Sequence, residues 1–296
     1  QFNDFKVGLR AQQNVLEVLA NMCFADVAGA NEWEEMNDEE EMDQDDNLVE
    51  ENSGSSVPQS PLVALIAQSR LPLAVVTRCK PLDVAIQQVF IGNATFGARV
   101  LSEFTKVQSR CFGCLSNMFG SMDFGLLGAD VVTATWTGLM ELCASPPLGT
   151  DDEFAEALTG CVWAMLRAAT DQTSTLQLAE MSPQHVEALV VGAKAYPSNE
   201  ELRVNIVGAL GCLGQIALTQ PETMHAVGVL LLHALEEPSG WVIAEALNGI
   251  FDVFDEPECN AVYTSLQMHG KLTTTSNGLK QRIKDARRHG DADLTG

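Results

Sequence analysis

The chain has 296 residues, of which 46% are hydrophobic, so it can bury a core and is not wholly disordered. Its formal net charge is −23, from 17 basic and 40 acidic residues. Because Lys and Arg contacts to phosphates dominate nucleic-acid binding, this charge disfavours a nucleic-acid-binding protein. The longest apolar stretches fall short of the roughly 18 residues that would suggest a membrane span.

The first predicted element is a helix that includes residues 14–23, NVLEVLANMC, where apolar side chains recur at helical spacing. The chain opens at Gln1 inside this apparent helix, without Met and without a charged-then-apolar leader. We therefore expect a piece of a longer protein rather than a secretory start.

An acidic run follows the first helix. Residues 32–51 contain 12 of the 40 acidic residues, and no Lys or Arg occurs between Arg10 and Arg70. Two interpretations stay open: a solvated, disordered spacer, or an electrostatic arm that binds a basic partner. The run lacks the glycine at the sixth position of a calcium-binding loop, so we do not expect calcium.

Beyond residue 60 the pattern is helical and repetitive. Two amphipathic helices are clear at 201–218 and 240–254, whereas alternating strand-like runs are nearly absent. Five helices overlay without internal gaps, and the last four are spaced 47, 48 and 40 residues apart. Repeats of about 40 to 47 residues are typical of HEAT and armadillo proteins. One apolar position of the overlay holds Leu19, Leu115, Val162, Leu210 and Ile250, and a second holds Met22, Met118, Met165, Leu213 and Val253.

The sequence also supplies the second helix of each pair. Pro183 begins one such helix and Pro197 ends it, while Pro221 and Pro238 mark the next. Since a helix pair cannot bury its apolar stripe alone, neighbouring pairs must stack. We predict an all-α fold, an α-solenoid of HEAT/armadillo-type repeats. Its expected divisions are a helical repeat at 1–31, an acidic loop at 32–60, and a solenoid with C-terminal capping helices at 61–296.

Motifs that could suggest chemistry have simpler explanations. Cys111 and Cys114 form a CxxC inside a helix rather than at a helix N-terminus, so we predict core thiols rather than a redox site. The glycines of GALGCLG, at 208–214, lack the dinucleotide-binding spacing and instead predict a close helix crossing. Arg203 is expected to pair with an acid of a neighbouring repeat. We expect no metal site, no cofactor and no enzymatic activity.

The chain ends in a stretch of opposite charge. From Lys271 onward it carries 6 bases and 3 acids. A polar helix that caps the solenoid is the simplest interpretation, because a terminal repeat must present a polar outer face. A nuclear signal or an RNA contact is the alternative.

Several segments together resemble the symportin family, the HEAT-repeat import chaperones of 5S-rRNA-binding ribosomal proteins. The resemblance rests on LRAQQNVLEVLANMCFADVAGANEWEEM near the N-terminus, LRVNIVGALGCLG at 202–214 and AEALNGIFDVFDE at 244–256. It implies that the chain binds the pair of newly made large-subunit ribosomal proteins that joins 5S rRNA. It also implies nuclear import by an importin bound to a segment before Gln1, and shuttling between cytoplasm and nucleus. We expect a monomer, and the charge and the short apolar stretches lead us to expect no direct contact with nucleic acid or membrane.

The resemblance and the charge pattern suggest which residues face the cargo. Asn21, Asn117 and Asp252 share one register of the overlay, where polar side chains either hold an extended peptide or link repeats, and Glu245 and Asn248 lie on the polar side of the last strong helix. In the acidic run the candidates are Trp33, Glu34, Glu35, Asp38, Glu39, Glu40, Glu41, Asp43, Asp45 and Asp46. The alternative function is a generic HEAT-repeat scaffold between proteins, with the acidic run as a spacer.

Overall fold

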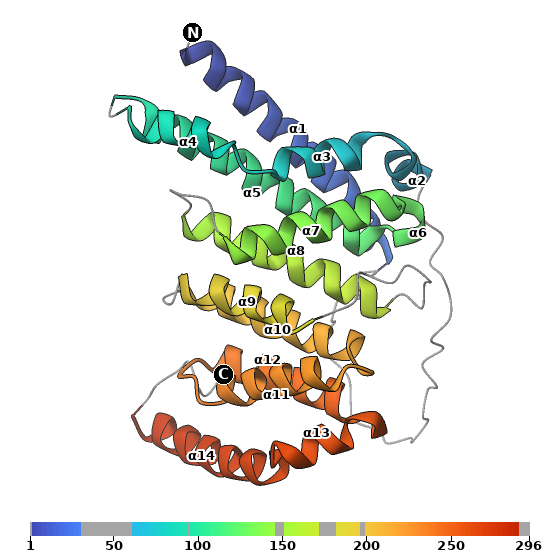
Figure 1. Cartoon of the computed structure of the whole chain (residues 1–296), viewed down its shortest axis with the longest axis vertical. Coiled ribbons are helices and arrows are strands. Elements are labelled where there is room, and N and C mark those ends of the chain that lie inside the picture. The colour runs from blue at the N-terminus through green and yellow to red at the C-terminus, as the bar shows by residue number, and fades with distance from the viewer. Residues whose placement is uncertain are drawn as a thin grey trace, which may run out of the picture.

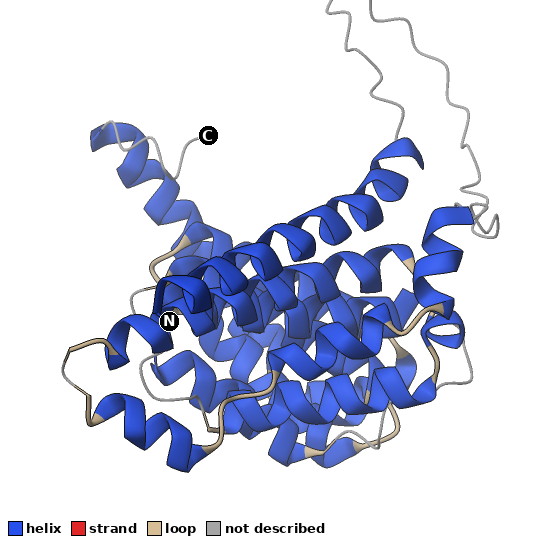
Figure 2. Cartoon of the chain, turned by 90° about the horizontal axis from the view of Figure 1, so that it is seen from above, coloured by secondary structure: helices blue, strands red, loops and turns tan. Residues whose placement is uncertain are grey.

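A computed structural model describes residues 2–30, 61–93, 95–145, 151–171, 182–195 and 199–289 of the chain. Every regular element in these ranges is a helix, as Figure 2 shows in a view from above. The all-α prediction is therefore confirmed. The elements are α1 (Phe2–Ala30), α2 (Pro61–Gln68), α3 (Leu71–Cys79), α4 (Val84–Ile91), α5 (Gly97–Ser121), α6 (Phe124–Leu127), α7 (Ala129–Ala144), α8 (Asp152–Asp171), α9 (Pro183–Ala195), α10 (Glu200–Ile216), α11 (Pro221–Ala234), α12 (Gly240–Phe254), the 3₁₀ turn η1 (Pro257–Cys259), α13 (Asn260–Ser265) and α14 (Met268–His289).

The helices form a two-layered solenoid. In the first layer α1, α5, α8, α10 and α12 pack side by side in that order, and these are the five helices that the sequence overlay aligned. The second layer contains α3, α7, α9 and α11, each packed on its neighbours in both layers. Figure 1 shows the stack running from the N-terminal α1 at one end to the C-terminal α13 and α14 at the other.

Helices α10 and α12 begin within one residue of the predicted positions, and a capping residue precedes each of them. Asn199 precedes α10, and its side-chain oxygen accepts a hydrogen bond from the Leu202 amide at 2.9 Å. Ser239 does the same for the amide of Val242 at the start of α12, at 3.2 Å. Such caps satisfy amides that lack an intrahelical partner. Helices α9 and α11 begin at prolines, whose fixed φ suits the first helical position and whose missing N–H is not needed there.

The core confirms the overlay, with one exception. All five residues of its first apolar position are buried, and so are four of the five at the second. The exception is Met22, which is 39% exposed, while the adjacent Cys23 is fully buried in its place. Helix α1 lies at one end of the first layer and packs mainly against α5, so its buried stripe is narrower than that of a helix with neighbours on both sides.

Small residues let the helices of the first layer approach closely, as the GALGCLG stretch predicts. A Cβ atom at Gly211 of α10 would lie 3.0 Å from the Cα of Gly249 in α12. A Cβ atom at Gly208 would overlap the indole of Trp163 from α8. Gly211 and Gly208 therefore set the spacing of three successive helices.

The CxxC thiols lie in the core. Cys111 and Cys114 are both fully buried in α5, and burial raises the pKa of the Cys114 thiol well above its usual range. Burial likewise raises the pKa of Cys161 to about 12. Thiols held in the neutral form are poor nucleophiles, so these cysteines act as small apolar side chains.

Two further observations concern the described helices. Taken singly, none of them is long and apolar enough to cross a membrane, and only the bent pair α2 and α3 reaches that length and composition together. The β-branched KLTTTS stretch, from Lys271 onward, lies within α14.

Candidate protein-binding groove

The exposed face of the first layer is hollowed by a groove with a volume of about 660 Å³. It crosses four consecutive helices of the layer, α5, α8, α10 and α12, which makes it longer than a pocket within one repeat. We call it the acidic groove. The residues that line it are Ser109, Arg110, Gly113, Ser116, Glu153, Glu156, Ala157, Gly160, Glu200, Glu201, Val204, Asn205 and Trp241.

Carboxylates dominate the charge of the acidic groove. Glu153 and Glu156 come from the first turns of α8, and Glu200 and Glu201 from the first turn of α10. Acidic side chains are favoured there because they face the positive end of a helix dipole. Arg110 is the one basic residue of the lining, and its Nε lies 3.3 Å from a carboxylate oxygen of Glu17 in α1. The groove thus carries a net negative charge.

The carboxyl groups of the groove interact with one another. The pKa of Glu156 is raised, first by a hydrogen bond to Glu201, then by burial, and also by the negative charges of Glu201 and Glu153. Asn199 opposes this shift by a hydrogen bond that lowers the pKa. Like charges held this close repel, so a positively charged ligand in the groove would be stabilised.

Trp241 forms an apolar wall of the acidic groove. It is the second residue of α12, and its side chain is 75% exposed. Exposed indoles of this kind offer a large rigid surface for stacking and for cations. The small residues Gly113 of α5 and Ala157 and Gly160 of α8 leave open space in the groove above these two helices.

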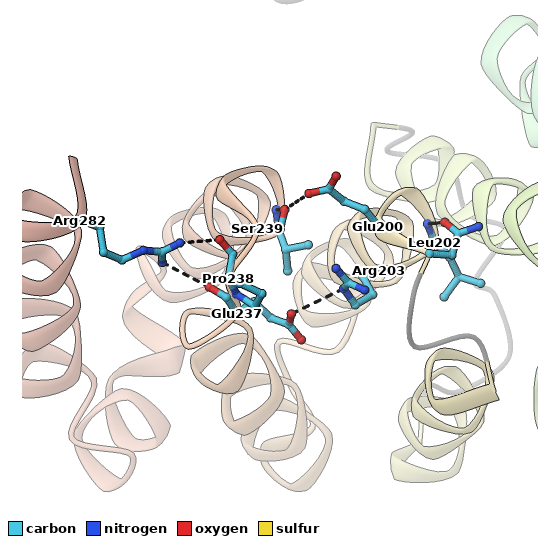
Figure 3. Close-up of polar contacts among 9 residues, drawn as sticks. Glu200, Leu202, Arg203, Glu237, Pro238, Ser239 and Arg282 are labelled. Atoms are coloured by element: carbon cyan, nitrogen blue, oxygen red, sulfur yellow. Dashed lines mark hydrogen bonds and ion pairs between the residues drawn. The ribbon is translucent and has the colours of Figure 1, made fainter. Parts of the chain in front are cut away.

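A set of polar contacts, shown in Figure 3, fixes the α11–α12 loop, which lies just before Trp241. The hydroxyl of Ser239 donates a hydrogen bond to the carboxylate of Glu200, which links the start of α12 to the groove wall of α10. Nearby, the Nε of Arg203 lies 3.6 Å from a carboxylate oxygen of Glu237 in the preceding turn. The predicted pairing of Arg203 with a neighbouring repeat is confirmed.

Figure 3 also shows how the last helix joins this loop. The Arg282 guanidinium of α14 donates hydrogen bonds to the backbone carbonyls of Glu237, at 3.3 Å, and Pro238. Leu272 and Leu279 of the same helix pack against the core. Helix α14 therefore packs onto the last described repeat, and its role as a cap of the solenoid stays a prediction.

Of the predicted site residues in α1 and α5, one links two helices of the first layer and the other is exposed to solvent. Asn117 of α5 donates its side-chain amide to the backbone carbonyl of Ala20 in α1, at 3.0 Å. This is the repeat-linking role that the sequence left open. From a different register of α10, Asn205 makes a similar link to α8, with its Nδ2 3.4 Å from the Glu156 carbonyl oxygen. Asn21 is exposed at the end of the layer.

The three candidates of α12 lie together, but outside the lining of the acidic groove. Burial raises the pKa of the Glu245 carboxyl, and the charge of Asp252 raises it further. A hydrogen bond from Asn248 and the charge of Arg167 lower it. Asn248 and Asp252 are exposed, so this end of the helix face is accessible to a partner.

The predicted residues of the acidic run lie outside the described part of the chain, namely Trp33, Glu34, Glu35, Asp38, Glu39, Glu40, Glu41, Asp43, Asp45 and Asp46. Sequence reasoning missed the groove carboxylates of α8 and α10. The available signal was an acidic pair in the first turn of two successive helices of the overlay. Within the described ranges, no three His, Cys, Asp or Glu side chains are placed to hold a metal ion.

Comparison with known proteins agrees with this architecture. A family model described as "SYO1-like, TPR repeats" matches residues 60–295. The chain is 26% identical over 263 residues to "HEAT repeat-containing protein 3" of Mus musculus, covering 84% of this chain and 38% of the relative. It is 25% identical over 292 residues to the Homo sapiens protein of the same name, covering 93% and 42%. The chain thus spans about two fifths of the length of these relatives.

Proposed function

This chain belongs to the SYO1-like family of TPR-repeat proteins, and we propose that it is a chaperone for the large-subunit ribosomal proteins that bind 5S rRNA. In this proposal it covers their basic rRNA-binding surface and supports their joint import into the nucleus. Family membership, the HEAT-repeat relatives and the charge of the solenoid face all support the proposal.

The observation that carries the proposal is the acidic groove. Proteins that bind rRNA contact its phosphates mainly with Lys and Arg. Glu153, Glu156, Glu200 and Glu201 offer the same kind of negative charge along one face of the solenoid. A basic surface bound there is kept from other polyanions and from aggregation. Rigid helices hold these carboxylates, which lowers the entropy that binding costs.

The acidic run at 32–51 adds to this attraction in the proposal. Each exposed ion pair contributes only about 0.2–1 kcal/mol, so useful affinity needs many of them. The run and the groove together provide many carboxylates on one chain. Negative charge of this extent also speeds association with a basic partner, by about 10- to 10³-fold at low salt.

The import step involves a further partner. We place the importin contact outside residues 1–296, and we expect the protein in both cytoplasm and nucleus. We do not propose an RNA contact for the basic helix α14, because its Arg282 is engaged with the α11–α12 turn and its Leu272 and Leu279 pack against the core. The protein is proposed to act as a monomer without direct contact to nucleic acid.

A generic HEAT-repeat scaffold is the alternative function. The solenoid and the exposed side chains of α12 suit a protein–protein contact of any kind. The two functions differ in their dependence on charge. A scaffold with a neutral interface loses little affinity with added salt, whereas an interface of many ion pairs loses most of it.

The test is the affinity of the chain for purified 5S-rRNA-binding ribosomal proteins at 50 and 300 mM salt. The matched variant replaces the acidic residues of 32–51 with Asn and Gln, so the segment keeps its length. The proposal predicts tight binding that weakens with salt, weakens again in the variant, and is competed by 5S rRNA. Absence of binding at low salt contradicts it and leaves the scaffold function.

A further inference from the structure

The second layer contains a groove of its own, in the N-terminal part of the stack where α3, α4 and α7 lie (Figure 1). Helix α3 packs on α7 whereas α4 packs on α5, so the layer opens between α4 and α7. The opening has a volume of about 890 Å³, and Phe112 and Leu115 of α5 lie at its floor. We call it the second-layer groove. It lies on a different side of α5 from the acidic groove.

Buried amides hold the α3–α4 wall of the second-layer groove in place. The Nε2 of Gln108 in α5 donates hydrogen bonds to the backbone carbonyls of Cys79 and Lys80, both at 3.0 Å. The Nε2 of Gln87 in α4 donates one to the carbonyl of Leu82, at 2.7 Å. In the described ranges, no buried polar side-chain atom of the groove lining lacks a partner. The groove is therefore preformed, and its buried polar groups are already satisfied.

Apolar side chains are exposed in and beside this groove. Val84 of α4 lines it and is 69% exposed, and Val89 of the same helix is 71% exposed. Gln87 is the one buried residue of α4. Leu65 of α2 and Leu73 of α3 extend the exposed apolar surface. Apolar patches of this kind, rimmed by polar residues, mark interaction sites.

The region around the α3–α4 wall is basic, in contrast to the rest of the chain. Residues 61–99 contain four basic residues and one acidic residue, a net charge of +3, whereas the whole chain carries −23. All four bases are exposed, and none of them forms an ion pair with a carboxylate of the described ranges; they are Arg70, Arg78, Lys80 and Arg99. Lys80 lines the groove, and Glu141 of α7 lies on the opposite wall. Negative charge on a bound partner is therefore favoured on the α3–α4 side.

A protein segment buried in this groove must satisfy its own backbone hydrogen bonds, because the groove offers mainly apolar side chains. An α-helix does so, and it presents its apolar face to an apolar groove while its polar face stays in water. We propose that the second-layer groove docks an amphipathic α-helix of a partner protein, with apolar side chains in the groove and acidic side chains toward the bases of the α3–α4 wall. This inference goes beyond the proposed function and does not rest on it, because it concerns the other helical layer.

The test uses the whole chain and three labelled peptides of about 18 residues, which is long enough to form a helix. The first carries a stripe of Leu at helical spacing with Glu on the opposite face. The second has Lys in place of Glu, and the third has the composition of the first in an order without a stripe. Fluorescence anisotropy at about 150 mM salt, where long-range attraction is screened, gives the dissociation constants. We expect the Glu peptide to bind about tenfold or more tightly than the peptide without a stripe.

Gly138→Phe fills the groove, because Gly138 lines it and a Cβ atom there meets nothing within 4 Å. This variant should weaken binding of the Glu peptide by about tenfold or more and leave binding of the Lys peptide unchanged. Gly278→Phe in α14 is the matched control, because a Cβ atom there also meets nothing within 4 Å and the residue does not line the groove. Circular dichroism checks that both variants keep their helices.

A second pair of variants tests the charge of the wall. Lys80→Glu should weaken binding of the Glu peptide by about 2- to 30-fold. Lys194→Glu should leave it unchanged, because Lys194 is an exposed base of α9 outside the groove lining. Equal losses in these two variants would contradict a site at the α3–α4 wall.

Three other results would overturn the inference. The first is equal binding of the Glu peptide and the peptide without a stripe, or equal losses in the Gly138 and Gly278 variants. The second is about tenfold tighter binding of the Glu peptide once the acids of 32–51 are replaced by Asn and Gln, which would assign the groove to the acidic run of the same chain. The third is a dimer that Gly138→Phe dissociates, which would assign the groove to a second copy.

Discussion

Replacing Gly211 with Ala tests how closely α10 and α12 are packed. The new Cβ atom would lie 3.0 Å from the Cα of Gly249, whereas carbon atoms in good contact are about 3.5–4.0 Å apart. Backbone stands on the other side of this contact, so no side chain can rotate away. Either the two helices move apart, or the variant keeps an unfavourably short contact between these two atoms.

The expected change in the free energy of unfolding has two opposing parts. Ala is favoured over Gly in a helix interior by about 1 kcal/mol. Overpacking in a core costs about 1–3 kcal/mol. Gly138→Ala in α7 is the control, because a Cβ atom there meets nothing within 4 Å and only the helix gain applies. The difference between the two variants therefore isolates the overpacking cost, and we expect Gly211→Ala to be less stable than Gly138→Ala by about 1–3 kcal/mol.

Urea unfolding followed by circular dichroism measures this difference. Repeat proteins need not unfold in a single step. The urea midpoints of two variants are therefore compared only if the free energy of unfolding falls with urea at the same slope in both. Gly138→Ala should raise the midpoint relative to the wild type, and Gly211→Ala should lower it or leave it unchanged. A midpoint for Gly211→Ala at or above that of Gly138→Ala would refute the close crossing of the two helices.

Three further substitutions probe the core, the groove and the C-terminal cap. Phe112 is fully buried and meets the ring of Phe154 edge-on at 5.4 Å, so Phe112→Ala should cost about 3–5 kcal/mol in urea unfolding. A loss below about 1 kcal/mol would contradict this packing. The raised pKa of Glu156, caused first by its hydrogen bond to Glu201, means that the folded state binds the proton more tightly, so the wild type loses stability as pH rises above 4.5. Because glutamine carries no charge at any pH, the Glu156→Gln variant does not show this loss, and its thermal midpoint should exceed that of the wild type at pH 7 but not at pH 4. Equal midpoints at pH 7 would contradict the interaction between the carboxyl groups of Glu156 and Glu201. Arg282→Met removes two hydrogen bonds to the α11–α12 turn while keeping the apolar stem, and amide exchange in α14 should become about fivefold faster, an effect of about 1 kcal/mol. Unchanged exchange would mean that this contact does not hold α14 in place.

The solenoid could be predicted because its buried positions recur with the period of a helix. Leu115 and Leu210 occupy equivalent positions in α5 and α10, and both are buried. Periodicity reports which side of a helix is apolar, and it works for any helix with neighbours on both sides. It failed at Met22, because the position of α1 at the end of the layer is a property of the stack and not of the local sequence.

The acidic groove could be predicted only in part. The carboxylates of Glu156 and Glu201 are 45 positions apart in the chain and meet only because α8 and α10 lie side by side. A single-helix pattern does not contain that contact. The exposure of Trp241 depends on how the turn before α12 is held, by Ser239 and Glu200. By contrast, the sequence overlay assigned Asn117 to the correct position of its repeat. Only the structure shows that its side chain bonds to the backbone of α1.

Hydrogen exchange of the chain with and without a purified 5S-rRNA-binding ribosomal protein tests the central claim most directly. The account predicts protection at the first turns of α8 and α10 and at the start of α12, where Glu153, Glu156, Glu200, Glu201 and Trp241 line the groove. Added salt should reverse this protection. Binding that leaves these segments unprotected, or that protects only the second layer, would contradict the assignment of the acidic groove as the cargo site.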